Sequence, residues 1–213
     1  MTTLSSKAGT KGVPRADREQ QILAAATEEF GSRGYEATTV AAIAVRVGVT
    51  KPLLHQYFGS KQGLYLACLD PIGDRLLDAI RTAMAGHDTD APPTPLRVLN
   101  ALFTALDAQR KAWFVLYDPT LPPGSDAARR AAHYRDAIDG LAATGTAELL
   151  RTTGTTDPLD ADALTYAWRG LCTALVRWWI DHPDQSPEAM TRRCIRLTEA
   201  AHTVFAAGDG NST

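Results

Sequence analysis

Apolar residues recur along most of the chain at intervals of three and four, and no long stretch alternates apolar with polar residues. This period is that of an amphipathic α-helix, and the abundance of alanine favours the same structure. We therefore predict an all-α protein of about nine helices. The expected helices span approximately residues 15–32, 39–46, 50–57, 61–86, 96–110, 112–117, 125–152, 157–180 and 187–207.

Glycine, proline and hydroxyl residues mark the expected ends of these helices. Gly48 is expected to form the turn between the second and third helices. Thr50 and Ser60 precede the third and fourth helices, where a hydroxyl side chain caps free backbone N–H groups. Pro71 falls inside the fourth helix, so we expect a kink there or a split into two helices.

The segment 34–61 joins two short helices through a glycine turn, which is the arrangement of a helix-turn-helix. Apolar residues bracket the turn, and polar residues occupy the other face of the second short helix. The bracket consists of Ile43, Val47, Val49 and Leu54. In this motif the second helix presents its N-terminal side chains to the major groove of DNA.

Residues 15–61 resemble the N-terminal part of the TetR family of bacterial regulators. The matching positions are Gly34-Tyr35, Thr39, Ile43-Ala44, Gly48-Val49, Thr50, Tyr57-Phe58 and Ser60-Lys61. The resemblance implies a homodimeric repressor, not an enzyme, that binds palindromic operator DNA and releases it when a small apolar or aromatic effector binds the C-terminal part. It implies neither a cofactor nor a metal. The chain departs from the family at His55, where a tyrosine is common, and at Pro52, where a small residue is common.

The resemblance and the side-chain chemistry together predict a DNA-binding set. Lys51, Gln56 and Arg46 can reach base edges or phosphates, and Leu53 can contact a thymine methyl group. Hydroxyl and cationic groups at helix N-termini and at the groove rim suit phosphates. The whole set is Thr39, Arg46, Thr50, Lys51, Pro52, Leu53, His55, Gln56, Tyr57 and Lys61. The alternative is that the lysines are solvated surface charges and Tyr57 packs on the first helix.

The middle of the chain is rich in aromatic residues, several of which carry a polar group. Such residues build pockets for apolar or aromatic ligands, and the family resemblance implies that some of them line an effector cavity. The candidates are Phe103, Trp113, Phe114, Tyr117, Tyr134, Tyr166 and Trp168. The alternative is that most of them simply fill the core.

The last two expected helices each carry an apolar seam spaced by three and four residues. Helices of this kind pack on each other, and a wide apolar face can also pack on a second copy. The resemblance implies a four-helix dimer interface here. The predicted interface residues are Leu164, Leu171, Leu175, Trp178, Trp179, Met190, Leu197 and Val204. A purely intramolecular core is the alternative.

Charge and composition complete the expected organisation. Residues 1–61 hold eight Lys or Arg and five acidic residues, a balance of +3, whereas the remaining 14 basic and 19 acidic residues give −5. We expect a disordered arm over 1–14, a DNA-binding domain over 15–61, an effector-binding and dimerisation domain over 62–207, and a frayed tail over 208–213. Only the basic N-terminal domain is expected to meet a polyanion.

No apolar run reaches the roughly 20 residues that a membrane-spanning helix needs. The N-terminal residues are polar and lack the apolar stretch of a signal peptide, so the expected location is the cytoplasm. Three widely spaced cysteines, Cys68, Cys172 and Cys194, fit buried thiols in a reducing compartment better than disulfides, redox sensors or metal ligands.

An enzyme and an adaptor protein are the two alternatives to a regulator. An enzyme is not indicated, because the chain contains none of the common metalloprotease, hydrolase or nucleotide-binding motifs and its histidines are scattered. An adaptor that keeps this fold without binding DNA is disfavoured by the intact basic recognition helix. Steeply salt-dependent binding to duplex DNA separates a regulator from both alternatives.

Overall fold

The computed structural model describes residues 14–86 and 92–206, and for 201–206 only the backbone. In these ranges the protein is all-α. The helices are α1 Arg15–Ala37, α2 Val40–Val47, α3 Lys51–Phe58, α4 Lys61–Ala85, α5 Thr94–Leu106, α6 Ala112–Leu116, α7 Asp126–Thr152, α8 Pro158–Ile180 and α9 Pro187–Ala206, with a 3₁₀ turn at Asp107–Gln109. The predicted arm, apart from Pro14, and the predicted tail lie outside the described residues.

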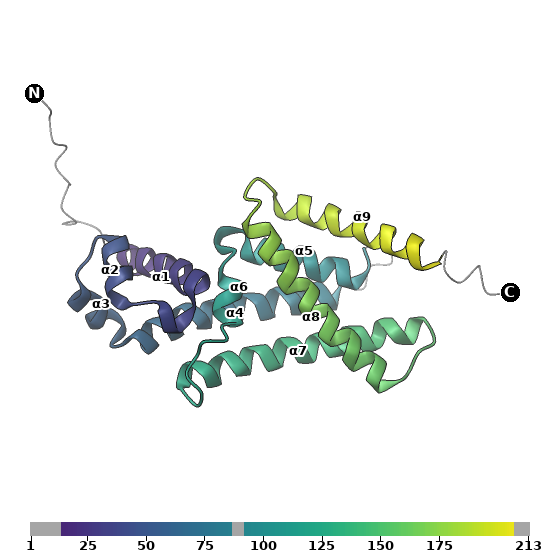
Figure 1. Ribbon diagram of the computed structural model, residues 1–213, viewed down its shortest axis with the longest axis horizontal. Helices are drawn as coiled ribbons and strands as arrows, with labels where there is room; N and C mark the ends of the chain where they lie inside the picture. The colour runs from purple at the N-terminus through teal and green to yellow at the C-terminus, as the bar shows by residue number, and fades with distance from the viewer. Residues whose placement is uncertain (1–13, 87–91, 207–213) are drawn as a thin grey trace, which may run out of the picture.

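The three N-terminal helices form a small head at one end of the molecule (Figure 1). Its interior is apolar and is built by Ile22, Phe30, Ile43 and Leu54. Gly34 leaves the helical region (φ 76°, ψ 169°), so the regular part of α1 ends near the predicted boundary although the helix is assigned as far as Ala37.

Helix α4 connects the head to the body and runs unbroken through Pro71, so the predicted split does not occur. Pro71 is exposed, so water can satisfy the backbone carbonyl that loses its N–H partner there. On either side of Pro71, Leu69 and Ile72 are buried and hold both halves of α4 in the core. Near this point α4 approaches α7 closely. A Cβ atom on Gly73 would lie only 2.4 Å from the Tyr134 ring, so glycine is needed here.

The body is a layered bundle in which α4 packs against α5 and α7, α8 packs against α7, and α9 packs against α5. In Figure 1, α8 crosses α7 and α9 points away from the head. The turn between α8 and α9 is held by Arg110, whose guanidinium donates to the backbone carbonyls of Trp179, His182, Pro183 and Gln185. This turn fixes the angle at which α9 leaves α8.

All three cysteines are buried and free, as predicted. Burial raises the pKa of the Cys68 and Cys172 thiols to about 12 each, and it also raises the pKa of Cys194. These groups therefore stay protonated near neutral pH and are poor nucleophiles.

None of the helices in the described ranges combines the length and the apolar character needed to cross a bilayer. Within the same ranges, no cluster of three or more His, Cys, Asp or Glu side chains is arranged to hold a metal ion.

Candidate functional site

The third helix has one bare face and one buried face. Leu54 points into the head and is almost completely buried. Lys51, Pro52, His55 and Gln56 are all exposed. This division follows from the helical period, because positions 51, 52, 55 and 56 share one side. A polar, accessible strip therefore runs along α3.

The turn before α3 sets the angle of this strip. Gly48 adopts the left-handed conformation (φ 75°, ψ 34°), and its backbone N–H bonds to the last carbonyls of α2. Only glycine takes this conformation readily. Val49 then donates its N–H to the Ala44 carbonyl at 2.9 Å, so the chain turns sharply into α3.

A residue with a hydroxyl group precedes each of the helices α2, α3 and α4. Thr39 and Ser60 cap α2 and α4 by accepting from the N–H groups of Ala42 and Gly63. Thr50 occupies the N-cap position of α3, but its side chain makes no capping hydrogen bond, unlike our expectation. The Thr50 backbone carbonyl accepts from Leu53 and Leu54 instead, which leaves its exposed hydroxyl available to an outside partner.

Tyr57 and Lys61 are half-buried at the edge of the α3 strip. The guanidinium of Arg15 lies 5.1 Å from the centroid of the Tyr57 ring, so Tyr57 is indeed in contact with α1. Lys61 Nζ lies 4.4 Å from the Tyr35 ring centroid and donates to the Glu36 carbonyl. Partial burial lowers the pKa of Lys61, against the opposing effect of nearby acidic groups.

Arg46 and Leu53 are less available than predicted. The Arg46 guanidinium forms an ion pair with Glu29 at 2.5 Å. Its positive charge is therefore already balanced within the head. Leu53 is half-buried, so only part of its side chain can reach a partner outside.

A buried carboxylate joins the head to the body. Asp118, in the loop after α6, is 3% exposed. One of its oxygens accepts the backbone N–H of Tyr35 at 2.6 Å, and the other accepts the N–H and the hydroxyl of Thr120. The Thr120 hydroxyl oxygen in turn accepts the N–H of Glu36 at 3.1 Å. We call Asp118 and Thr120, with the Tyr35 and Glu36 N–H groups, the Asp118 clamp.

Two contacts support the clamp from α6 and its approach. The Tyr65 hydroxyl donates to the Val115 carbonyl, and Lys111 forms an ion pair with Glu28. Gly31 allows the backbones to come this close, because a Cβ there would meet the Lys111 carbonyl at 2.3 Å. Glu28 and Gly31 therefore tie the C-terminal part of α1 to the start of α6, and Tyr65 ties α4 to α6.

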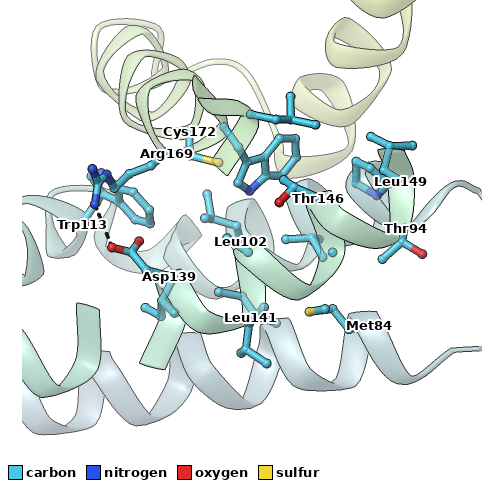
Figure 2. A pocket seen from close by; sticks show the side chains of 18 of the residues that line it. Met84, Thr94, Leu102, Trp113, Asp139, Leu141, Thr146, Leu149, Arg169 and Cys172 are labelled. Atoms are coloured by element: carbon cyan, nitrogen blue, oxygen red, sulfur yellow. Dashed lines mark hydrogen bonds and ion pairs between the residues drawn. The ribbon is translucent and has the colours of Figure 1, made fainter. Parts of the chain in front are cut away.

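The body contains a mostly apolar cavity between α4, α5, α6, α7 and α8 (Figure 2). The space open to the centre of a water molecule is about 110 Å³. On this measure one water needs roughly 10–15 Å³, so the cavity has room for a small organic molecule. It is lined by Ile80, Met84, Thr94, Pro95, Val98, Leu102, Trp113, Tyr117, Ile138, Asp139, Leu141, Ala142, Gly145, Thr146, Leu149, Leu164, Trp168, Arg169 and Cys172.

Of the seven aromatic residues predicted for a pocket, Trp113, Tyr117 and Trp168 line this cavity. Phe103 is wholly buried elsewhere, in edge-to-face contact with Trp179 at 5.2 Å. Tyr166 is 72% exposed, because it lies one helical position away from the inward face of α8.

The other two candidates also lie away from the cavity lining. Tyr134 packs on Gly73 and donates its hydroxyl to Asp74. The Phe114 ring lies 5.0 Å from the guanidinium of Arg177 and is not part of the cavity lining, unlike its neighbour Trp113. These two residues join α4 to α7 and α6 to α8.

Polar groups gather on one side of the cavity. Figure 2 shows Asp139 and Arg169 joined near Trp113, with Thr94, Leu149 and Met84 at the far side. The Asp139–Arg169 ion pair measures 2.7 Å. Trp113 donates its indole N–H to the Thr173 hydroxyl. The Tyr117 hydroxyl is buried and has no hydrogen-bond partner among the described residues.

The residues predicted for a dimer interface divide into three groups. Trp179 and Met190 are wholly buried within the chain, and Leu164 lines the cavity. Leu171 and Leu197 are 46% and 55% exposed, and Leu175 and Trp178 are half-buried. The side chain of Val204 lies outside the described residues.

Trp179 differs from its neighbour for a clear reason. Its ring lies under Arg110 at 3.9 Å, and its indole N–H donates to the Gln185 carbonyl. It therefore anchors the α8–α9 turn and faces α5, so it does not widen the outer apolar face as predicted. Trp178 lies between His182, stacked at 3.7 Å, and Arg193.

Sequence reasoning did not find the Asp118 clamp or the Asp139–Arg169 pair. Asp118 lies in a segment that was interpreted only as a helix breaker, and its partner lies 83 residues earlier. Asp139 and Arg169 are 30 residues apart, on separate helices. The sequence carried a weak signal for Asp118, which follows an aromatic helix directly and precedes a threonine by two positions.

Comparisons with known proteins agree with this geometry. Residues 22–68 match the family described as bacterial regulatory proteins, tetR family. The chain is 47% identical over 106 residues to HTH-type transcriptional activator FasR of Mycolicibacterium smegmatis. That alignment covers 50% of this chain and 48% of FasR, so the chain spans about half the length of this curated relative.

The resemblance to solved structures extends over most of the chain. A TetR-like transcriptional regulator from Rhodococcus sp. RHA1 is 28% identical, with a TM-score of 0.60, over 87% of this chain and 99% of that chain. FadR from Bacillus subtilis, solved in complex with stearoyl-CoA, shares the fold at 16% identity and a TM-score of 0.60, over 84% of this chain and 96% of that chain. The matched family consists of regulatory proteins, in agreement with the prediction that the chain is not an enzyme. Residues 22–68 therefore match the TetR family of bacterial regulatory proteins, and most of the chain shares the fold of a solved TetR-like regulator.

Proposed function

We propose that this protein is a ligand-responsive transcription repressor of the bacterial cytoplasm. Two copies hold a palindromic operator with their α3 helices, and a small apolar or aromatic effector in the body cavity releases the DNA. The observation that carries the proposal is the bare strip of Lys51, His55 and Gln56 on a helix whose other face is buried through Leu54. Among the described residues, Lys51 and Gln56 make no hydrogen bond or ion pair, and the His55 ring pairs with the Gly59 carbonyl at the end of the same helix. The apolar core of the head therefore does not use these polar side chains.

The chemistry of the strip suits a DNA groove. Gln56 is able to pair with adenine and Lys51 with guanine, since both are exposed on the same side of α3. Thr39, Thr50 and Lys61 flank the strip at helix N-termini, where backbone N–H groups favour phosphates. Arg46 has a smaller role in this proposal, because Glu29 already balances its charge.

The apolar cavity supports an effector site within the body. Its lining is mainly Leu, Ile, Val, Met and aromatic side chains, which favour a hydrophobic ligand. A protein of this fold has been solved with stearoyl-CoA, a ligand with a long aliphatic chain, and this supports an aliphatic or aromatic effector here.

The Asp118 clamp provides a path from the cavity to the head. Trp113 and Tyr117 line the cavity, and Asp118 follows Tyr117 directly. Because Asp118 also holds the Tyr35 N–H, a ligand that displaces α6 must alter the position of α1. Helix α4 is a second connection, since Ile80 and Met84 line the cavity and its N-terminal end lies in the head.

A dimer is needed because one short recognition helix reads too few base pairs to define an operator. The exposed Leu171 and Leu197, together with the half-buried Leu175 and Trp178, are the side chains best suited to such a contact. An apolar face of this kind is costly to leave in water.

Activation of transcription is a second candidate, because FasR is named an activator. An activator and a repressor can use the same contacts to DNA and differ in the position of the operator relative to the promoter. In vitro transcription from a promoter that carries the bound sequence separates the two, since the transcript decreases with a repressor and increases with an activator.

The direct test of the proposal is duplex binding over a range of salt concentrations. We expect the logarithm of the affinity to fall steeply with the logarithm of salt, and the double variant Lys51→Ala/Gln56→Ala to lose binding. Arg151→Ala, on an exposed part of α7 far from the head, is the control and should bind as the wild type does. Binding without a salt dependence, or an unaffected double variant, contradicts the proposal.

A further inference from the structure

Tyr117 lines the cavity and carries an unused hydrogen-bond donor. Its hydroxyl is buried, and no other described residue accepts from it or donates to it. Buried polar groups are normally paired, so an orphan hydroxyl on a residue that lines the cavity calls for an explanation. The other polar groups in the lining are engaged within the protein, including Asp139 with Arg169 and Thr146 with Thr165.

The Tyr117 side chain is held in place as a neutral donor. Burial raises its pKa far above the usual value, and the negative charge of Asp139 acts in the same direction. Its ring is stacked on Trp113 with centroids 4.5 Å apart, and Trp113 is itself fixed by Thr173. The O–H group is therefore both protonated at neutral pH and preoriented.

Two of the charged side chains that act on this hydroxyl, Asp139 and Arg169, balance each other, and the third, Arg135, donates to the Leu116 carbonyl. Asp139 and Arg169 pair with each other at 2.7 Å and are half-buried. An anionic group beside Tyr117 would meet the Asp139 carboxylate, and a cationic group would meet the Arg169 guanidinium. An uncharged oxygen acceptor avoids both penalties.

The rest of the cavity accepts a hydrocarbon. Away from the ion pair, Met84 and Leu149 line the far side (Figure 2). A ligand with a polar group at the Tyr117 side and an apolar chain directed to this far side would satisfy both parts of the cavity.

We propose that the effector is an uncharged amphipathic molecule whose carbonyl oxygen, as in an ester, thioester or amide, accepts a hydrogen bond from Tyr117 while its hydrocarbon chain extends toward Met84 and Leu149. This inference rests on the proposed effector site and adds the chemical class of the ligand. It also makes Tyr117 the specificity-determining residue. Since the next residue is Asp118, the same contact lies beside the clamp that holds the head.

The experiment titrates the full chain with three probes that share an alkyl chain and differ in the head group: methyl decanoate, decanoate and decane. Binding is followed by the fluorescence of the tryptophans that line the cavity, Trp113 and Trp168. We expect the wild type to bind methyl decanoate most tightly. Tyr117→Phe should lower the affinity for methyl decanoate about tenfold, which is the effect of losing one hydrogen bond, and should leave the affinity for decane unchanged.

Tyr166→Phe is the matched control, because it removes the same hydroxyl from an exposed tyrosine of α8. It should leave the affinities for all three probes unchanged. Tyr117→Phe is expected to fold, since it removes only an unpaired buried group, and its thermal midpoint should not fall below that of the wild type. A lower midpoint would mean that the hydroxyl is paired inside the protein, which overturns the inference.

The inference is also overturned if methyl decanoate does not bind the wild type or if decanoate binds more tightly than the ester. An equal change in the affinities for all three probes on Tyr117→Phe would overturn it as well. These outcomes leave the DNA-binding proposal intact, because salt-dependent duplex binding is measured without a ligand. Loss of that duplex binding, with the probe ranking preserved, would contradict the DNA-binding proposal and leave the ligand class standing.

Discussion

The carboxylate of Asp118 accepts the backbone N–H of Tyr35 at 2.6 Å, although the two residues belong to different parts of the molecule. Tyr35 lies in the last turn of α1, which packs against α2 of the helix-turn-helix, and Asp118 follows a helix that lines the cavity. This hydrogen bond is therefore one of the connections between the two proposed sites. This relationship generates the first prediction.

Asp118→Asn should lower the free energy of unfolding by about 1.5–3 kcal/mol, because both carboxylate oxygens accept hydrogen bonds and an amide offers only one acceptor. Once an operator has been selected from random duplexes, methyl decanoate should still bind the variant but should no longer change its operator affinity. Urea unfolding and operator binding with and without the probe provide the measurements.

The matched control for the clamp is Asp162→Asn, because Asp162 is an exposed aspartate of α8 that makes no hydrogen bond or ion pair with the described part of the chain. Its stability and its response to the probe should equal those of the wild type. A normal response in Asp118→Asn would move the coupling from the clamp to another connection, with α4 as the next candidate.

Lys61→Ala should weaken binding to every duplex and reduce the slope of log affinity against log salt by about one unit, as the loss of one phosphate contact requires. Lys61 also packs on Tyr35, so the measurement needs thermal unfolding beside the salt titration. Arg46→Ala should change the slope less, since Glu29 already balances its charge. If Arg46→Ala reduces the salt slope more than Lys61→Ala does, Lys61 is not the main phosphate contact of the two.

Leu197→Asp should yield a monomer in analytical ultracentrifugation and lose affinity for a palindromic duplex. The reason is that Leu197 is 55% exposed on an apolar face, where a charge would be desolvated by a second copy. Val45→Asp is the control for the ultracentrifugation only, because Val45 is 81% exposed in α2 of the head, remote from α8 and α9, and an added charge in the head would itself oppose duplex binding. A Leu197→Asp protein that still sediments as a dimer would place the interface elsewhere.

Trp179→Ala should cost about 3–5 kcal/mol of folding free energy, since it empties the space between α5 and the α8–α9 turn. Its ring contacts Phe103 and Arg110 and is wholly buried. Denaturant unfolding at several protein concentrations gives the test. The loss should be present at every concentration, whereas a residue that acts only in a dimer would show a loss that depends on concentration.

Features that depend on a few neighbouring residues were determined by the sequence alone. The order of the helices and most of their ends follow from apolar spacing and from local groups such as Ser60, Gly48 and Pro187. The bare face of α3 follows in the same way, because the helical period separates Leu54 from Gln56. Helix period and capping act within about four residues, so they can be read along the chain.

Only the tertiary structure decided which apolar faces meet. Trp178 and Trp179 are adjacent and chemically alike, yet the angle between α8 and α5 buries one completely and leaves the other half-exposed. Tyr117 and Tyr166 also have the same side chain, yet the first lines the cavity and the second is exposed to water. Contacts such as Asp118 with Tyr35, or Asp139 with Arg169, depend on packing across long separations in sequence, and no local period encodes them.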